Sequence, residues 1–255
     1  MRVLILGVGD AFTTKGFGTS ALIRNEPDRA GRPPRYLLVD CPDLIHRALA
    51  EGCHHSGWKV DAHDIDDIII THLHGDHCNG LESFAFSRLV ARLQEKEKTL
   101  PRVHTHPEAA ARLWERLAPA MDAPIHKGGR KARLEDYIDL RVIEPGKPAT
   151  IAGLTVECRY SIHPIPTIGV KIRAARGSLG WSGDTVFDPA HVEWLSDCDV
   201  IVHEANIGPA HTQVEVLNSL PEIVRKKMRI THIVDDFDPS WTDIKPLREG
   251  EVLEF

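Results

Sequence analysis

Four side chains that can bind a metal lie together in the segment HLHGDH at residues 72–77. On an extended chain His72 and His74 point to the same side, and Gly75 permits the tight turn that brings Asp76 and His77 back toward them. Three imidazoles and a carboxylate suit zinc, or manganese or iron where the donors are harder. A single tetrahedral metal with an open position for substrate needs fewer ligands, so the cluster indicates two metal ions. Histidines of an ordinary surface loop are the alternative, but this dense ligand set directly after an isoleucine-rich strand argues against it.

A pair of metals needs further ligands, and the second half of the chain offers three at or near strand ends. His163 follows residues 158–162, Asp184 lies in the segment WSGDT just past an apolar run, and His232 ends the segment RITH. Asp184 is suited to bridge two metals because a carboxylate has two oxygens to share, whereas a histidine offers one nitrogen.

The elements that must position these residues follow from apolar patterning. We expect strands at 3–7, 21–24, 36–40, 65–71, 140–143, 154–160, 168–173, 179–182, 200–203 and, as the last strand before an acidic tail, 230–232. Helices are expected at 44–51, 81–98, 107–117 and 188–195, and around 214–228 with a break near Pro221; residues 123–132 are expected to form a loop. Pro42 and Asp43 would start the first helix and Gly52 would end it. This pattern favours two packed sheets with helices outside, in a single domain spanning residues 1–255.

Composition narrows the function classes. The 255 residues carry 31 Lys and Arg against 37 Asp and Glu, a net charge of −6, so no overall field attracts a polyanion and a small-molecule substrate is favoured over nucleic acid. Charged residues interrupt every apolar stretch, the start of the chain lacks a cleavable signal pattern, and the five cysteines form no CxxC motif. We therefore expect a cytoplasmic protein with reduced thiols and no membrane partner.

The order HxHxDH, a histidine, an aspartate within SGDT and a late histidine after a strand resembles the metallo-β-lactamase superfamily over residues 3–232. The resemblance implies an α+β fold, an αββα four-layer sandwich of two mixed β-sheets with outer helices and a site at one edge between the sheets. It implies a dinuclear site, with zinc expected and manganese or iron as alternatives. The implied ligands are His72, His74 and His163 for the first ion, Asp76, His77 and His232 for the second, and Asp184 for both.

Other histidines and one cysteine compete for ligand roles. His104 and His106 lie where the superfamily often has the strand that leads into an outer helix, so we expect a structural or supporting role for them. Cys78 follows the cluster, but the superfamily's thiolate ligand falls in the second half, where this chain has Asp184. The remaining histidines have no motif context and are expected at the solvated surface: His46, His54, His55, His63, His126 and His191.

Two further segments, VHEA at 202–205 and AHT at 210–212, resemble motifs of the ribonuclease Z and phosphodiesterase branch. There the histidine assists at the scissile phosphate, which implies that His211 donates a hydrogen bond or proton and that Glu204 orients it. The alternative is that residues 203 and 204 simply end a buried strand. Only 20 residues separate His163 from Asp184, too few for a tRNA-gripping arm, so the arm-less phosphodiesterases of small cyclic or ribose phosphates are the nearer comparison.

The leading hypothesis is hydrolysis of a small phosphodiester by a metal-bridging hydroxide, with Asp76 as a ligand that can also receive the proton of the nucleophile. The same ligands could position water for an ester, thioester, lactone or lactam, which is the alternative. An iron-dependent oxidoreductase is weakened by His74, where the superfamily's diiron reductases tend to have a carboxylate. A non-catalytic metal-binding module has no need for seven ligands. The basic segment 127–133 could touch a phosphate, although a solvated loop is expected, and a homodimer is left open.

Overall fold

The first of two mixed β-sheets is built mainly by the N-terminal half of the chain. The computed structural model describes residues 1–27, 32–96 and 99–255. The strands of this seven-stranded sheet are β1 (Arg2–Gly7), β2 (Ser20–Asn25), β3 (Arg35–Val39), β4 (Asp67–Ile69), β5 (Arg102–Thr105), β6 (Asp139–Val142) and β13 (Val252–Glu254). They pair in the order β13-β1-β2-β3-β4-β5-β6. Strands β3 to β6 run parallel, so the segments that leave β3, β4 and β5 emerge at the same edge.

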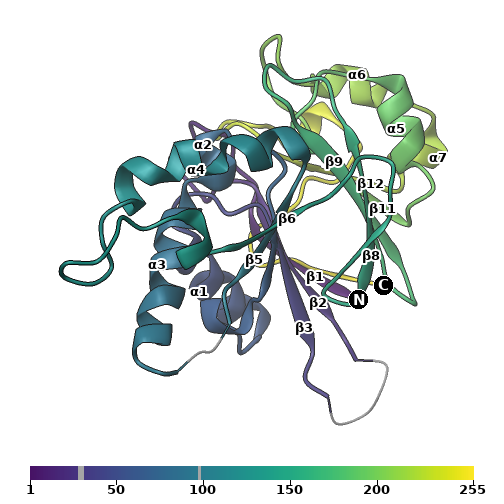
Figure 1. Cartoon of the computed structure of the whole chain (residues 1–255). Helices are drawn as coiled ribbons and strands as arrows, with labels where there is room; N and C mark the ends of the chain where they lie inside the picture. The colour runs from purple at the N-terminus through teal and green to yellow at the C-terminus, as the bar shows by residue number, and fades with distance from the viewer. Residues whose placement is uncertain (28–31, 97–98) are drawn as a thin grey trace.

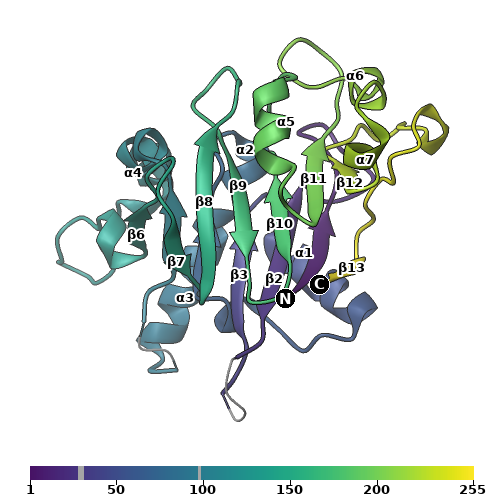
Figure 2. The ribbon, with the colours of Figure 1, turned by 90° about the vertical axis from the view of Figure 1, so that its right-hand side faces the viewer.

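The second, six-stranded sheet comes from the C-terminal half (Figure 2). Its strands are β7 (Ala149–Ile151), β8 (Leu154–Tyr160), β9 (Ile168–Arg173), β10 (Ser178–Trp181), β11 (Val200–Glu204) and β12 (Met228–Thr231), paired in the order β12-β11-β10-β9-β8-β7. Strands β10, β11 and β12 are parallel, and β9 is antiparallel to both β8 and β10. The carboxyl ends of β8, β10, β11 and β12 therefore share one edge of this sheet.

The core between the sheets follows from the two-residue period of the strands. Val3 and Ile5 of β1 are fully buried in the same cluster as Val170 and Ile172 of β9, whereas Leu4 on the other face belongs to the cluster under the outer helices. Both faces of β1 are thus buried, and a register slip of one residue would exchange them. This alternation holds the two sheets together and fixes the edge on which the site is built.

Helices cover both outer faces (Figure 1). On the first sheet lie α1 (Ile45–Ser56), α3 (Gly80–Leu93) and α4 (Pro107–Met121), and on the second lie α5 (Pro189–Leu195), α6 (Val214–Asn218) and α7 (Glu222–Arg225). The short helix α2 (Gly75–Cys78) lies at the site. The remaining helical turns are of the 3-10 type: η1 (Ala62–Asp64), η2 (Leu134–Asp136) and η3 (Pro239–Trp241). The predicted α+β arrangement of two mixed sheets with outer helices is confirmed. No helix in the three described ranges is long and apolar enough to cross a membrane.

Three local predictions were wrong. Gly52 does not end the first helix, because α1 continues to Ser56 and is capped by Gly57 at φ 72°. A Cβ on Gly52 would lie 3.0 Å from Leu6 Cδ2, so the small size of Gly52 lets the helix approach the sheet. The chain after residue 232 is not only an acidic tail, because β13 pairs with β1. The helix predicted at 81–98 ends at Leu93, and positions 97 and 98 lie outside the described residues. Strand β7 was not predicted.

Candidate active site

The predicted ligands come together because each follows a strand that ends at the same edge of the sandwich. The HLHGDH segment follows β4 and continues into α2, between the two sheets. On the second sheet, His163 follows β8, Asp184 follows β10 and His232 follows β12 directly. Residues separated by up to 160 positions in the sequence thus meet at one place, where the ends of strands from both sheets lie together.

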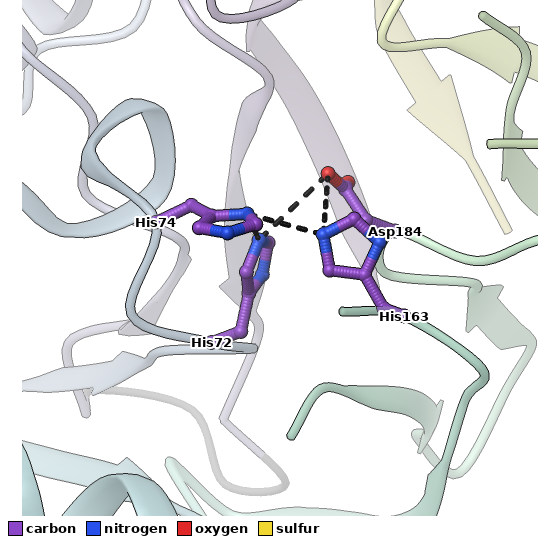
Figure 3. A group of neighbouring side chains, drawn as sticks. All are labelled: His72, His74, His163 and Asp184. Carbon is purple, nitrogen blue, oxygen red and sulfur yellow. Dashed lines mark hydrogen bonds and ion pairs between the residues drawn. The ribbon is translucent and has the colours of Figure 1, made fainter. Parts of the chain in front are cut away.

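His72, His74, His163 and Asp184 form one group, with one donor atom from each within 4.8 Å of all the others (Figure 3). His74 Nδ1 lies 3.1 Å from both His72 Nε2 and His163 Nε2. Asp184 Oδ2 lies 3.7 Å from His72 Nε2 and 3.9 Å from His163 Nε2. Three ring nitrogens and one carboxylate oxygen therefore point at a common centre.

Asp76, His77, Asp184 and His232 form a second group of the same kind. Nε2 of His77 lies 3.4 Å from both Asp76 Oδ2 and Asp184 Oδ1. Nε2 of His232 lies 3.2 Å from Asp76 Oδ2 and 3.5 Å from Asp184 Oδ2. Asp184 belongs to both groups and is 2% exposed.

Neighbouring groups fix the orientation of three of these rings. His77 Nδ1 lies 2.9 Å from Asp40 Oδ2, and since a carboxylate only accepts, Nδ1 donates and Nε2 is the nitrogen left to face the cluster. His163 Nδ1 likewise donates to the carbonyl oxygen of Ala210 at 3.2 Å. His72 Nδ1 lies 3.0 Å from Thr71 Oγ1. Ring nitrogens held in this way from behind are typical of histidines that bind a metal.

Asp40 was missed by the sequence reasoning. It follows β3 directly, it is fully buried, and it accepts hydrogen bonds from Thr71 N at 2.8 Å and from Thr71 Oγ1 as well as from His77. The available signal was an acid at the end of the apolar segment YLLVD, in the strand before the segment that carries three histidines. What that signal lacked was the pairing of β3 with β4, which puts Asp40 behind His77.

One buried atom in this cluster shows that the donors fit a cation. His77 Nε2 is buried and has no hydrogen-bond partner, although it faces two carboxylates, Asp76 and Asp184. A buried polar atom without a partner is costly unless a ligand satisfies it. Imidazole nitrogens with carboxylate oxygens are a donor set for divalent transition metals, so these two groups of residues fit a metal site.

The pKa values of the histidines shift in different directions in the two groups. Burial lowers the pKa of His72 and His74, and it lowers that of His163 to about 4, so all three are neutral and have a lone pair to offer. Burial also lowers the pKa of His77, but Asp184 and Asp40 outweigh it and the pKa is raised. The burial of Asp184 acts against its charge, yet His77 and His232 hold its pKa well below the ordinary value. Such opposed shifts in one cleft mark a functional site.

Glu204 and His211 lie beside these two groups of residues. His211 Nδ1 lies 3.0 Å from Glu204 Oε1, which also accepts from Thr185 N at 2.8 Å. The His211 ring is 5.4 Å from that of His163 and 5.2 Å from that of His232. Burial lowers the pKa of His211, but the hydrogen bond to Glu204 outweighs it and raises the pKa. His211 therefore keeps a proton more readily than an ordinary histidine.

The competing candidates lie away from the cluster. His104 Nε2 is 2.8 Å from Asp67 Oδ1, and His106 is the N-cap of α4, where it accepts from the backbone of Ala109. Cys78 is buried and is absent from both ligand groups. The two histidines have structural contacts, as expected.

The surface prediction was correct for five of the six remaining histidines and wrong for His191. His191 is fully buried because α5 packs on the second sheet; its Nε2 lies 3.1 Å from the carbonyl oxygen of Ser182, and its ring occupies the space above Gly169. The other five, His46, His54, His55, His63 and His126, are exposed. In the basic segment, Lys127, Arg130, Lys131 and Arg133 are exposed, and Arg130 and Lys131 pair with Asp136 and Asp122. The solvated loop predicted there is confirmed.

A pocket of about 830 Å³ opens onto the metal ligands. His74, Asp76, Asp184, His211 and His232 form its inner wall. Loops that follow β1, β11 and β12 form the rest, and they contribute acidic and apolar side chains but no lysine or arginine among the described lining residues. This volume suits a small molecule.

Fold and site together define a hydrolase of the metallo-β-lactamase fold. Over 99% of this chain and 98% of the other, the structure is similar to the metallo-β-lactamase fold protein YhfI from Bacillus subtilis, with a TM-score of 0.78 and 16% sequence identity. At 27% identity over 208 residues, the chain is also similar to the cGMP-dependent 3',5'-cGMP phosphodiesterase A of Dictyostelium discoideum, a match that covers 73% of this chain and 22% of that protein.

The family is defined more closely by a match over nearly the whole chain. Residues 1–248 match the family model of the anti-Pycsar protein Apyc1. The anti-Pycsar protein Apyc1 of Paenibacillus sp. (strain J14) is 30% identical over 248 residues, covering 93% of this chain and 91% of that protein. The chain belongs to the anti-Pycsar protein Apyc1 family.

Proposed function

We propose that this enzyme hydrolyses a 3′,5′-cyclic nucleotide to a nucleoside monophosphate, with two divalent metal ions held by seven side chains. The observation that carries the proposal is the pair of four-residue donor groups that share Asp184, with the Glu204–His211 pair at their side. The names of the relatives support the substrate class, since one of them is a 3',5'-cGMP phosphodiesterase. A small pocket without lysine or arginine among its described lining residues fits a phosphodiester that carries one negative charge.

The ligands divide between the two ions as the geometry groups them. His72, His74 and His163 would hold one ion, Asp76, His77 and His232 the other, and Asp184 both. Zinc is the ion that this donor set fits best. When bound, such a pair of ions supplies an activated water and neutralises the phosphoryl oxygens. The chain's own contribution is to fix these donors before substrate arrives, through Asp40, Thr71 and the carbonyl of Ala210.

His211 would serve as the proton donor to the leaving oxygen of the ribose. Its Nδ1 donates to Glu204, so Nε2 is the nitrogen that remains to face a substrate. The pKa of His211 is raised by its hydrogen bond to Glu204 against the effect of burial, so His211 keeps its proton to higher pH than an ordinary histidine, which favours a general acid. Water would add to phosphorus and release one of its protons to solvent, while one P–O bond to the ribose breaks and the released oxygen takes the proton from His211. Solvent then returns a proton to His211.

Asp76 fits a ligand role better than a second role as proton acceptor. Burial acts to raise its pKa, but His232 and His77 hold the pKa below its ordinary range. A carboxylate with a lowered pKa stays ionised and is a poor base, whereas an ionised oxygen is what a metal needs.

The test combines metal content with turnover. We expect about two metal ions per chain, hydrolysis of cGMP or cAMP to the monophosphate, and a fall in kcat of about 100-fold or more for His211→Asn at unchanged metal content. The matched control is His126→Asn, the same substitution at an exposed loop position, which should leave kcat unchanged.

Two outcomes would overturn the proposal. Bound metals with hydrolysis of p-nitrophenyl acetate or a lactone, but of no cyclic nucleotide, would make the enzyme a carbonyl hydrolase. Full phosphodiesterase activity in His211→Asn would remove His211 from the mechanism.

A further inference from the structure

Three large apolar side chains lie exposed around the mouth of the active-site pocket. Phe12 follows β1 and is 85% exposed, Ile207 follows β11 and is 69% exposed, and Trp241 belongs to η3 and is 50% exposed. All three line the same pocket as the metal ligands. Single exposed apolar residues are ordinary on a protein surface, but three around one cleft form a binding surface.

Phe12 and Ile207 are held in place by one chain of hydrogen bonds. Asp10 Oδ1 accepts from Phe12 N at 3.0 Å, and its Oδ2 accepts from Asn206 Nδ2 at 3.1 Å. Asn206 Oδ1 in turn accepts from Ile207 N at 2.6 Å. Asp10 is 6% exposed and Asn206 8% exposed, so this pair is buried beneath the two side chains that it positions.

The third side chain is fixed independently. Asp238 Oδ1 accepts from Ser240 N at 2.8 Å and begins the turn that carries Trp241. The Trp241 ring packs edge-on against Phe237, with ring centres 5.5 Å apart. The backbone carbonyl oxygen of Trp241 accepts from Asn218 Nδ2 at 2.8 Å. An aromatic face on a fixed backbone loses little entropy when a flat ligand stacks on it.

We propose that Phe12, Ile207 and Trp241 form the binding surface for the base of the substrate, while the metal ligands hold its phosphate. This inference rests on the proposed cyclic nucleotide phosphodiesterase function and adds the residues that recognise the rest of the substrate. A base is flat, largely apolar on its faces and able to stack on aromatic rings, which matches what these three residues offer.

The charges of the same wall agree with a neutral group at this position. Asp235 and Asp236 line the pocket beside Trp241. The hydrogen bonds from Thr13 and Thr14 hold the pKa of Asp235 low, so it stays ionised. A chain of phosphates lying along this wall would meet carboxylates, whereas an uncharged base would not.

The experiment compares a substrate with a base and one without. Steady-state kinetics are measured for cGMP or cAMP and for methyl ribofuranoside 3′,5′-cyclic phosphate, with wild type, Phe12→Ala, Trp241→Ala and Trp241→Phe. We expect KM for the nucleotide to rise about 5- to 100-fold in the two alanine variants with little change in kcat, and no change for the base-free substrate. Trp241→Phe should restore most of the affinity.

The control is Ile223→Ala, which removes an apolar side chain that is 74% exposed but outside the pocket. Calorimetric binding of GMP or AMP gives a second readout that does not depend on turnover, and the alanine variants should bind more weakly. Equal losses with both substrates, or no loss with either, would overturn the inference and leave the phosphodiesterase function intact. If wild type hydrolyses neither substrate, the proposed function fails, and the binding measurement alone decides whether this surface takes a base.

Discussion

Replacing Asp40 by asparagine tests whether the buried carboxylate behind the ligands controls metal binding. Asp40 is fully buried and accepts from His77 Nδ1 at 2.9 Å, from Thr71 N at 2.8 Å and from Thr71 Oγ1. All of its partners donate, which a carboxylate with two accepting oxygens satisfies. An asparagine of the same shape has one accepting oxygen and one NH₂ group, which donates. Because all the partners of Asp40 donate, the NH₂ group must face another donor on one side.

The two orientations of the new amide fail in different ways. If its NH₂ faces His77, then His77 Nδ1 must accept and the ring proton moves to Nε2. Because Nε2 is the nitrogen that points at the cluster, it can then bind a metal only after it loses this proton. Loss of such a supporting group costs about 10- to 100-fold in metal affinity, or about 1.4–2.7 kcal/mol. If the NH₂ faces Thr71 instead, a buried backbone N–H loses its acceptor, which costs about 1–3 kcal/mol of folding stability.

Competition with a chelator measures the metal affinity of Asp40→Asn, and urea unfolding of the metal-free protein measures its stability. At least one of the two quantities should fall by about 1–3 kcal/mol. The matched control is Asp43→Asn, which changes an exposed carboxylate that accepts only from Asn79 Nδ2 at 3.0 Å among its described contacts. Wild-type affinity together with wild-type stability in Asp40→Asn would refute the reasoning.

Three further predictions concern the fold. Arg102 holds both oxygens of Asp67 at 2.7 Å, and Arg102→Met should cost about 2 kcal/mol, less than for a fully buried pair because the Arg102 side chain is 36% exposed. Burial acts to raise the pKa of Asp67, but Arg102 and His104 outweigh it and the pKa is lowered. In urea unfolding, the free energy of unfolding of the variant should therefore be below that of wild type above about pH 4, and the two values should converge at lower pH. Gly57→Ala meets no atom within 4 Å but places a Cβ at φ 72°, so thermal unfolding should reveal a loss of about 1 kcal/mol, and an unchanged melting temperature would contradict the strain. All five thiols are buried, so Ellman's reagent should react with them only after unfolding. Rapid reaction of the native protein would show that the packing around the thiols opens.

The parts of the site that sequence reasoning recovered are those with short-range signals. The segment at residues 72–77 was readable because four side chains that can bind a metal fall within six residues, and no tertiary information is needed to see that they can converge. His163, Asp184 and His232 were readable for a different reason: each follows an apolar run, and the ends of parallel strands meet at one edge. The resemblance implied how they group, and the pairing order β12-β11-β10-β9-β8 shows that the strands before them belong to one sheet.

The features that were missed all depend on which segments pair with which. Strand β13 is short and follows a polar stretch, and only its register with β1, where Leu253 lies opposite Val3, makes it a strand. In the sequence Asp40 is only an acid at the end of one strand, and the pairing of β3 with β4 is what places it behind His77. Asp10 and Asn206 are 196 positions apart, and neither belongs to a motif, yet their hydrogen bond joins the two loops that frame the pocket. Ligands are constrained by the metal to a few residue types at close spacing, whereas the groups that orient ligands or substrate need only reach the right atom, so their positions are set by the fold and leave no local pattern.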